Sequence, residues 1–194
     1  MKILKLFACA ALLVSATWAM GKNEIKPTME RQVQSAISIL QGGGNSQSKA
    51  SQIFALFDRY FDYRQMAALS LGNYYKTLTP AQQKEFSQLF EQKLKQNFIE
   101  KLGYYTDQTM IVQGISEPQG NRVHVKTVVK GKDKDYPINF KFFPRGGSDW
   151  VIYDVDVLGV SIIQSYKSQF GSLTQGGDFG AIMQRLRTSK AIAD

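Results

Sequence analysis

The side chains of this sequence that could carry out chemistry begin with a pair of carboxylates. Asp154 and Asp156 alternate near the end of a strand-like stretch, so both would lie on one face of a sheet. Such a pair can carry out acid–base chemistry. Nothing of the opposite role lies near the pair in the sequence, and carboxylates on a sheet surface or at a helix cap are far more common. We therefore predict no catalytic residue here and no enzyme activity.

Histidine and cysteine offer no better site. His124, the single histidine, lies between Arg122 and Lys126 on the charged face of another strand-like stretch, which favours a solvated imidazole over a base or a metal ligand. Cys9, the single cysteine, lies in an N-terminal segment that we expect to be removed, so no thiolate remains for catalysis or metal binding. The sequence also lacks a Gly-x-Ser-x-Gly elbow and a phosphate-binding loop. We predict no metal and no catalytic cofactor.

Basic, apolar and small residues follow one another at the N-terminus. Lys2 and Lys5 precede an apolar run at 6–14, and Thr17-Trp18-Ala19 has the small-x-small pattern of a cleavage site. The apolar run is too short to span a bilayer. A lipoprotein box ending at Cys9 would lie before most of that run. We predict a signal peptide at 1–19, a single domain at 20–194 and a location in the bacterial periplasm.

Charge and length narrow the class of protein further. Loss of Lys2 and Lys5 with the signal peptide would lower the formal net charge from +8 to +6. This surplus can serve solubility alone, or it can attract the chain to anionic lipid surfaces. Nucleic acid is not an expected partner in this compartment. Without cysteine the fold must rely on its hydrophobic core, and the remaining length is enough for one domain with a sizeable core.

Apolar periodicity divides the chain into helices, then strands, then helices. Thr79, Pro80 and Gln82 form the most specific local signal, with a cap, a proline at the first helical position and a capping-box glutamine. Asp62 and Gln65 have the same capping spacing. The expected helices cover 28–40, 53–60, 62–72, 79–103, 160–173 and 178–187, and the expected strands cover 104–113, 123–130, 136–142 and 150–157.

Short turns between these strands predict an antiparallel meander with one polar and one apolar face. In the stretch 150–173 we expect Val151, Tyr153, Val155 and Val157 to point to one face, with Asp154 and Asp156 on the other. After a turn at Gly159 the period becomes helical, which predicts a helix that folds back over the apolar face. The fold class is therefore α+β: a twisted four-stranded sheet covered on one face by amphipathic helices. The surplus of apolar surface fits an ordinary core or an apolar pocket between the two layers.

Two strings of the sequence resemble the MlaC family, which also carries the toluene-tolerance label. They are FDYRQMAALSLGNYYKTLTPAQQKEFSQLF at 61–90 and WVIYDVDVLGVSIIQSYKSQF at 150–170. The resemblance extends from about Ile53 to Leu186 in matching order. At one position, before Gly159, many relatives have an acidic residue where this chain has Leu158.

The resemblance implies a periplasmic phospholipid carrier that maintains the lipid asymmetry of the outer membrane. Its partners would be phospholipid, an inner-membrane ABC transporter with an MCE-domain ring and an outer-membrane lipoprotein–porin complex. The acyl chains would lie between the sheet and the helices, with the headgroup in solvent, and phospholipid would be the only ligand. We expect a monomer.

We predict that the lipid site is lined by apolar residues of the sheet and of the helices, with two tyrosines at its mouth. The sheet residues are Val125, Val129, Phe140, Phe142, Tyr153 and Val155, the helical residues are Leu71, Phe90, Leu94, Val160, Ile163 and Phe170, and the mouth residues are Tyr74 and Tyr75. Each of them also fits ordinary core packing. Two other classes of protein remain open: a small enzyme with a carboxylate in an apolar pocket, and an adaptor with an apolar groove for a partner helix.

Overall fold

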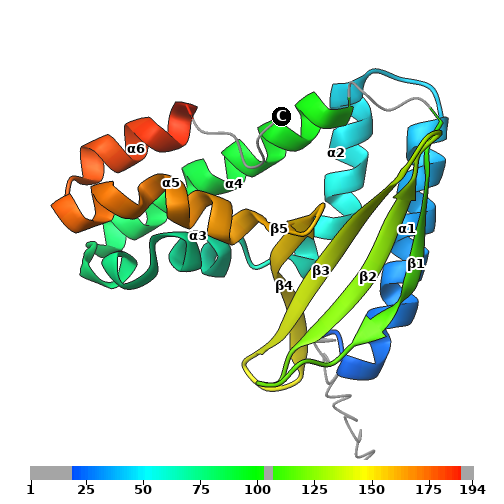
Figure 1. The fold of residues 1–194 in the computed structure, drawn as a ribbon, viewed down its shortest axis with the longest axis horizontal. Coiled ribbons are helices and arrows are strands. Elements are labelled where there is room, and N and C mark those ends of the chain that lie inside the picture. Colours follow the sequence, from blue (N-terminus) through cyan, green and yellow to red (C-terminus); the bar gives the residue numbers. More distant parts are fainter. Residues whose placement is uncertain (1–18, 103–106, 189–194) are drawn as a thin grey trace, which may run out of the picture.

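The computed structural model describes residues 19–102 and 107–188, and it has two layers (Figure 1). The sheet and the first helix lie on the right of Figure 1, most of the other helices lie on the left, and one long helix runs between them. The helices are α1 (Ile25–Gln41), α2 (Ser46–Phe57), α3 (Tyr63–Leu71), α4 (Pro80–Leu102), α5 (Ile162–Gly176) and α6 (Phe179–Thr188). The strands are β1 (Thr109–Ser116), β2 (Val123–Lys130), β3 (Asp135–Arg145), β4 (Asp149–Val157) and β5 (Val160–Ser161).

The helix starts predicted from capping residues are confirmed. The Asp62 side chain accepts a hydrogen bond from the backbone N–H of Gln65 at 2.9 Å, which caps α3. At α4 the backbone N–H of Gln82 donates to Thr79 Oγ1 at 3.3 Å, while Gln82 Oε1 accepts from the backbone N–H of Thr79 at 2.9 Å. This reciprocal pair is a capping box. Both signals are local in sequence, so they identify the helix starts without tertiary information.

The α+β class is confirmed, and the sheet has five strands rather than four. Its order is β1-β2-β3-β4-β5, with every neighbouring pair antiparallel. The additional strand, β5, has only two residues and folds back on the end of β4. The first strand was expected at 104–113, but β1 begins at Thr109; residues 103–106 lie outside the described part of the chain.

A β-bulge in β4 overturns part of the predicted alternation. Ile152 pairs with Phe142 and Asp154 pairs with Lys141, so Tyr153 is an extra residue in β4. Trp150 and Ile152 therefore share the apolar face with Val155 and Val157, whereas Val151 lies on the other face. Tyr153 packs edge-on against Phe143, 5.6 Å between ring centroids, on that second face. The prediction that Tyr153 points to the apolar face is wrong, and the prediction that Asp154 and Asp156 point away from it is confirmed.

The hydrophobic residues form two cores rather than one. The first lies between the sheet and the pair α1–α2, with Met29, Phe57 and Ile152 among its buried members. The second lies within the helical layer, where Phe86 and Phe90 of α4 pack with Tyr166 and Phe170 of α5. Because α5 packs mainly against α3 and α6, the prediction that it folds back over the sheet is wrong for most of its length. Within residues 19–102 and 107–188, α1 and α2 supply most of the helical cover of the apolar face, and Leu102 of α4 and Ile162 of α5 also pack against it.

A cluster around Lys95 fastens α4 to the segment between α2 and α3. Lys95 Nζ lies 2.7 Å from both Asp58 Oδ2 and Glu91 Oε1, and 5.0 Å from the ring centroid of Tyr63. Burial lowers the pKa of Lys95, but its hydrogen bonds to the two carboxylates outweigh burial and raise it overall. The Tyr63 hydroxyl donates to Asp58 Oδ1 at 2.7 Å, and burial, together with this bond, raises the Tyr63 pKa. The cluster orients the helix that runs between the two layers.

Cleavage after Ala19, as predicted, would make Met20 the first residue of the mature protein, and the structure shows how Met20 is held. The Met20 side chain is buried, its carbonyl accepts from the Trp150 N–H at 2.9 Å, and its nitrogen lies 3.3 Å from Asp149 Oδ1. A new α-ammonium group at Met20 would form a charge-assisted hydrogen bond to Asp149. We expect the intact mass of protein exported by a bacterial host to match residues 20–194. A mass that retains Cys9 with an attached lipid would contradict the prediction.

Candidate lipid-binding site

The apolar face of the sheet is sealed at one end and open at the other. At the sealed end, Val123, Phe142 and Ile152 lie side by side in neighbouring strands and are at most 1% exposed. At the opposite end the corresponding positions are Ile138 and Val157, which are half-buried, and Tyr136, which is 36% exposed. The helical cover therefore protects only part of an apolar surface that continues along the strands.

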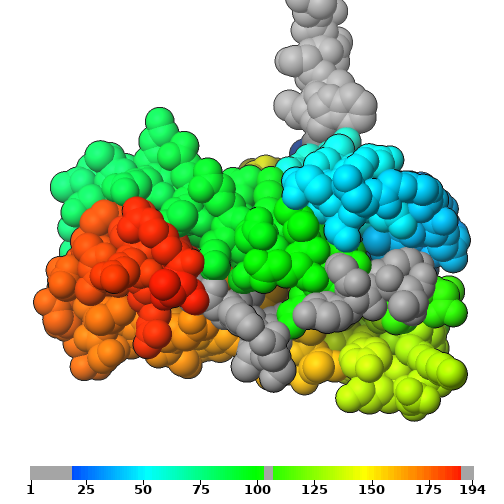
Figure 2. Space-filling view, turned by 90° about the horizontal axis from the view of Figure 1, so that it is seen from above, coloured from blue at the N-terminus to red at the C-terminus, as the bar shows by residue number. Residues whose placement is uncertain are grey.

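Half-buried apolar side chains from seven elements pack against the sheet core, and Ile138 and Val157 of the open end are among them. We call this set the apolar seam. Its members are Leu40 of α1, Leu56 of α2, Leu102 of α4, Val112 of β1, Ile138 and Phe140 of β3, Val157 of β4 and Ile162 of α5. Figure 2 views the molecule from this side, with α4 in green at the centre, α1 and α2 in blue to cyan at the upper right and strand residues in yellow-green at the lower right. Acyl chains need such a contiguous apolar surface, since burial of methylene groups drives their binding.

The lipid-lining residues predicted from the sequence fall into separate parts of the structure. Val125, Phe140, Phe142 and Val155 belong to the sheet core, and among them only Phe140 is also part of the apolar seam. Leu71, Tyr75, Phe90, Ile163 and Phe170 are buried in the helical core, with Tyr74 and Leu94 packed against it. Val129 is half-buried near the end of β2, and Val160 is 50% exposed. Tyr153 lies on the opposite face of the sheet. The two predicted walls therefore do not face each other.

Sequence reasoning missed most of the apolar seam. The helical members of the seam, such as Leu56, Leu102 and Ile162, lie on apolar helical stripes, and its strand members Ile138 and Val157 continue the strand alternation. The periodicity of these residues is therefore the same as that of fully buried core residues. What distinguishes them is their partial exposure in the folded chain. Their contacts depend on tertiary structure, and no local signal in the sequence reports them.

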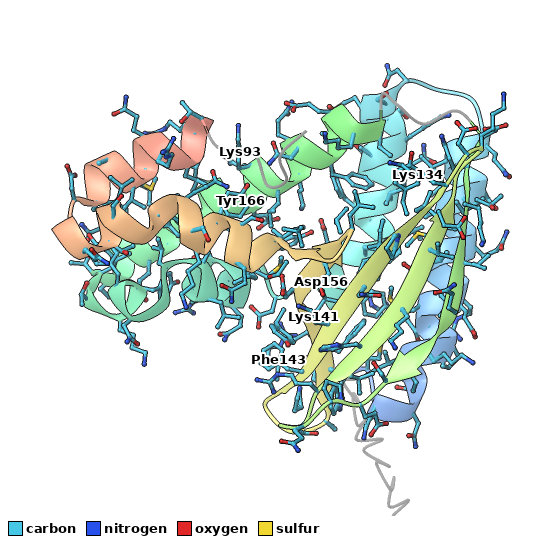
Figure 3. All side chains as sticks on the ribbon, in the orientation of Figure 1. Lys93, Lys134, Lys141, Phe143, Asp156 and Tyr166 are labelled. Atoms are coloured by element: carbon cyan, nitrogen blue, oxygen red, sulfur yellow. The ribbon has the colours of Figure 1, made fainter. Side chains whose placement is uncertain are left out.

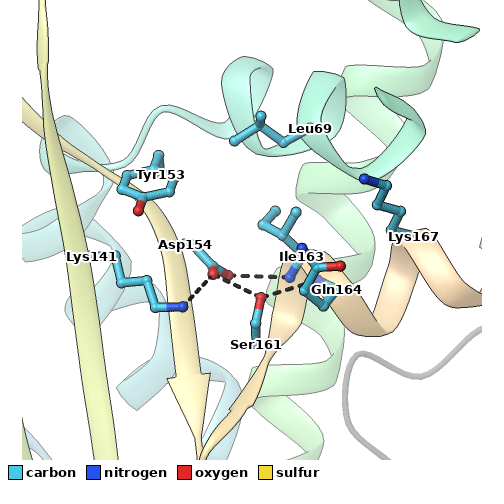
Figure 4. Close-up of a pocket in the computed structure, with 8 residues that line it drawn as sticks. All are labelled: Leu69, Lys141, Tyr153, Asp154, Ser161, Ile163, Gln164 and Lys167. Carbon is cyan, nitrogen blue, oxygen red and sulfur yellow. Dashed lines mark hydrogen bonds and ion pairs between the residues drawn. The ribbon is translucent and has the colours of Figure 1, made fainter. Parts of the chain in front are cut away.

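Two cavities lie outside the apolar seam, and both are lined by a mixture of polar and apolar groups. One, of about 250 Å³, lies where β3 and β4 meet α3 and α5, and the other, of about 300 Å³, lies between α3 and the start of α4. Figure 4 shows the first, lined by Leu69, Lys141, Tyr153, Asp154, Ser161, Ile163, Gln164 and Lys167. Small-molecule pockets typically occupy about 300–1,000 Å³ with predominantly apolar walls. Neither cavity is suited to two acyl chains.

Asp154 connects the sheet to the helical layer inside the first cavity. Its Oδ1 accepts from the backbone N–H groups of Val155 at 2.9 Å and Ile163 at 3.2 Å. Its Oδ2 accepts from Ser161 Oγ at 2.7 Å and from Lys141 Nζ at 3.0 Å (Figure 4). The carboxylate is 4% exposed and all these bonds are internal to the protein, so its geometry is that of a structural joint at the start of α5.

Lys141 completes the polar cluster on the outer face of the sheet (Figure 3). Its ammonium group lies 2.6 Å from Asp156 Oδ1 in addition to its contact with Asp154. Burial lowers the Lys141 pKa, but hydrogen bonds to the two carboxylates outweigh it and raise the pKa overall. Burial, followed by the charge of Lys141, lowers the pKa of His124 on the adjacent strand. The carboxylate pair is therefore neutralised by lysine, and the imidazole beside it is held in its uncharged form near neutral pH.

Comparison with known proteins identifies the family. A family model described as MlaC protein matches residues 30–188. This chain belongs to the MlaC family. Over 112 residues it is 26% identical to the intermembrane phospholipid transport system binding protein MlaC of Haemophilus influenzae, which covers 55% of this chain and 52% of that relative. The match thus spans about half the length of that curated MlaC protein.

The fold is also found in a solved structure. A phospholipid-binding protein from Ralstonia solanacearum, solved in complex with a phospholipid, has a TM-score of 0.71 to this member of the MlaC family. The match is 20% identical and covers 84% of this chain and 94% of the other. At this identity the likeness shows a shared fold. Within residues 19–102 and 107–188, no group of His, Cys, Asp and Glu side chains could hold a metal ion, and no helix is long and apolar enough to cross a membrane.

Removal of the Asp154 carboxylate should destabilise the protein strongly. Asp154→Ala leaves Lys141 with one partner and removes the acceptor for two backbone N–H groups, so we expect a loss of about 3 kcal/mol in the free energy of unfolding. Asp156→Ala is the matched control, because Asp156 forms an ion pair with the same lysine and is more exposed; we expect a loss of about 1 kcal/mol. Urea unfolding curves measure both values. Equal losses would contradict the role of Asp154 as a joint.

Proposed function

We propose that this protein is a periplasmic phospholipid carrier and that the apolar seam is where the acyl chains enter. The observation that carries the proposal is an apolar sheet face left open at one end in a chain of the MlaC family. The carrier takes phospholipid from one membrane complex and delivers it to another, namely an outer-membrane lipoprotein–porin complex and an inner-membrane ABC transporter with an MCE-domain ring. This traffic maintains the lipid asymmetry of the outer membrane.

The energetics of acyl-chain burial support transfer by direct hand-over. Two chains of about 16 carbons contain roughly 30 methylene groups, and their burial from water is worth roughly 24 kcal/mol at ~0.8 kcal/mol each. That value exceeds the practical limit of non-covalent affinity, about 21 kcal/mol. A lipid that moves from one apolar environment to another avoids most of this difference. Release therefore takes place at a docked partner, where the lipid never crosses water.

Loading requires the apolar seam to widen. Its side chains are half-buried against the sheet core, and neither of the two cavities described above lies among them. Ile162 and Phe61 pack against both hydrophobic cores, so the line between the cores is the direction in which the seam can open with each core intact. We propose that acyl chains insert along this line.

A carrier fits the polar groups better than an enzyme does. Asp154, the buried carboxylate among residues 19–102 and 107–188, forms four hydrogen bonds within the protein and faces away from the apolar seam. A catalytic carboxylate would need a vacant hydrogen-bonding position toward a substrate. The structure thus favours a role in binding and transport over one in catalysis.

The proposal predicts bound phospholipid in the purified protein. We expect about one phospholipid per chain after purification from bacterial periplasm in buffer without detergent. Native mass spectrometry followed by organic extraction and phosphorus assay measures the stoichiometry. An unrelated exported protein, purified in the same way, gives the background. Phosphorus no higher than this background would overturn the proposal and would favour an adaptor.

Bulk added at the apolar seam should reduce lipid retention without unfolding the protein. Val157→Trp adds volume at a half-buried seam position, so we expect several-fold less bound lipid with little change in the melting temperature. Ile163→Trp is the control, since Ile163 is 5% exposed in the helical core and overpacking there costs about 1–3 kcal/mol. We expect this variant to melt earlier. If Val157→Trp keeps its lipid, the acyl chains lie elsewhere.

A further inference from the structure

The turn between β4 and β5 has a backbone conformation that its sequence does not favour. Leu158 has φ = +55°, and within the described chain the only other non-glycine residue with positive φ is Asn121 at +53°. Asparagine adopts this left-handed conformation readily, whereas leucine does so at a cost in stability. Leu158 is also 51% exposed, so its side chain gains little from packing. Strain and apolar exposure at one residue indicate that the side chain serves a purpose outside the folded chain.

Further exposed apolar residues surround Leu158. Val160, two residues on, is 50% exposed, and Tyr136 on the neighbouring strand is 36% exposed. The Leu158 N–H donates to the Pro137 carbonyl at 2.9 Å, which places the turn beside Tyr136. The next pair along the same strands is Ile138 and Val157, both members of the apolar seam. An apolar path therefore continues from the sheet core, through the seam, to the exposed turn.

Lysines border this turn on the β2–β3 hairpin. Lys134 Nζ lies 5.2 Å from the ring centroid of Tyr136. Lys132 and Lys134 are exposed, whereas Lys130 forms an ion pair with Asp135. In Figure 2 the β2–β3 hairpin, in yellow-green, and the chain around the β4–β5 turn, in yellow-orange, lie at the same edge of the molecule. Exposed apolar side chains bordered by lysine match the boundary between acyl chains and anionic headgroups in a bilayer.

We propose that the turn Leu158–Val160, together with Tyr136, inserts into the surface of an anionic phospholipid bilayer. Insertion places the open end of the apolar seam directly against lipid, so that an acyl chain can pass between bilayer and seam without exposure to water. Lys132 and Lys134 contact headgroup phosphates beside the inserted side chains. This inference rests on the proposed carrier function, which it deepens by adding the membrane itself as a partner.

The test uses lipid-loaded protein and vesicles of phosphatidylethanolamine mixed with phosphatidylglycerol, in a flotation assay. Leu158→Asn removes the apolar side chain and suits the left-handed backbone, so we expect roughly fivefold weaker vesicle binding together with an equal or higher melting temperature. Ile115→Thr is the matched control, because Ile115 is 43% exposed on the edge strand β1, away from the turn. We expect this variant to bind vesicles as the unmodified protein does.

A second variant tests the contribution of charge. Lys132→Gln combined with Lys134→Gln should weaken binding to these vesicles by roughly fivefold for each lysine removed, and this loss should disappear with phosphatidylcholine vesicles. Bound phospholipid per chain should be unchanged in Leu158→Asn and in the double lysine variant.

Each result decides one of the two proposals. Vesicle binding of Leu158→Asn equal to that of the unmodified protein would overturn the membrane contact. A second result would also overturn the membrane contact: no variant binds vesicles, and Leu158→Asn slows lipid transfer only when membrane-protein partners are present. That result would assign the turn to a protein interface. Loss of bound lipid in Leu158→Asn would place this residue in the lipid site instead. Absence of lipid in the unmodified protein would reject the carrier function while leaving vesicle binding as a separate measurement.

Discussion

The buried carboxylate of Asp154 is the interaction on which the arrangement of the two layers depends. Asp154 lies on β4 and accepts hydrogen bonds from Lys141 on β3 and from Ser161 on β5. It also accepts from the backbone N–H of Ile163, so it connects three strands to the first turn of α5. A carboxylate removed from water is stable only if its lone pairs are satisfied, so these partners are required together. Their positions direct α5 away from the sheet. The apolar face is then covered mainly by α1 and α2, and its end around Ile138 and Val157 stays half-buried.

Two separate cores follow from this geometry, and they explain how the chain can be both stable and adaptable. Phe86, Phe90 and Phe170 are fully buried inside the helical layer, which therefore has a close-packed core of its own. The sheet core has its own sealed end around Phe142 and Ile152. Widening of the apolar seam, as proposed for loading, would separate side chains that are already half-buried. A single continuous core would have to lose close packing throughout its interior to admit a ligand, at several kcal/mol for each cavity created.

The sequence predicted the features that depend on neighbouring residues, and it failed where distant segments decide. The caps at Asp62 and Thr79, the order of helices and strands, and the outward position of Asp156 all follow from local spacing. The face of Tyr153 did not, because one inserted residue in β4 reverses the alternation before it, and the insertion is defined only by pairing with Phe142 and Lys141 of β3. The predicted lipid walls combined residues of both cores, since apolar periodicity is the same whether a stripe packs on a sheet or on other helices.

The partial exposure of the apolar seam is itself a compromise between solubility and transfer. An open apolar face as long as the whole sheet would favour aggregation, because large exposed apolar patches associate. A fully enclosed pocket would hold two acyl chains so tightly that release would become slow, since the lipid would have to leave an apolar interior through water. Half-buried residues such as Leu56, Ile138 and Val157 keep little apolar surface in water and still border the solvent. In the proposed carrier, a lipid that enters between them would remain in contact with the surface through which it must leave, and the partner that receives it would set its direction of movement.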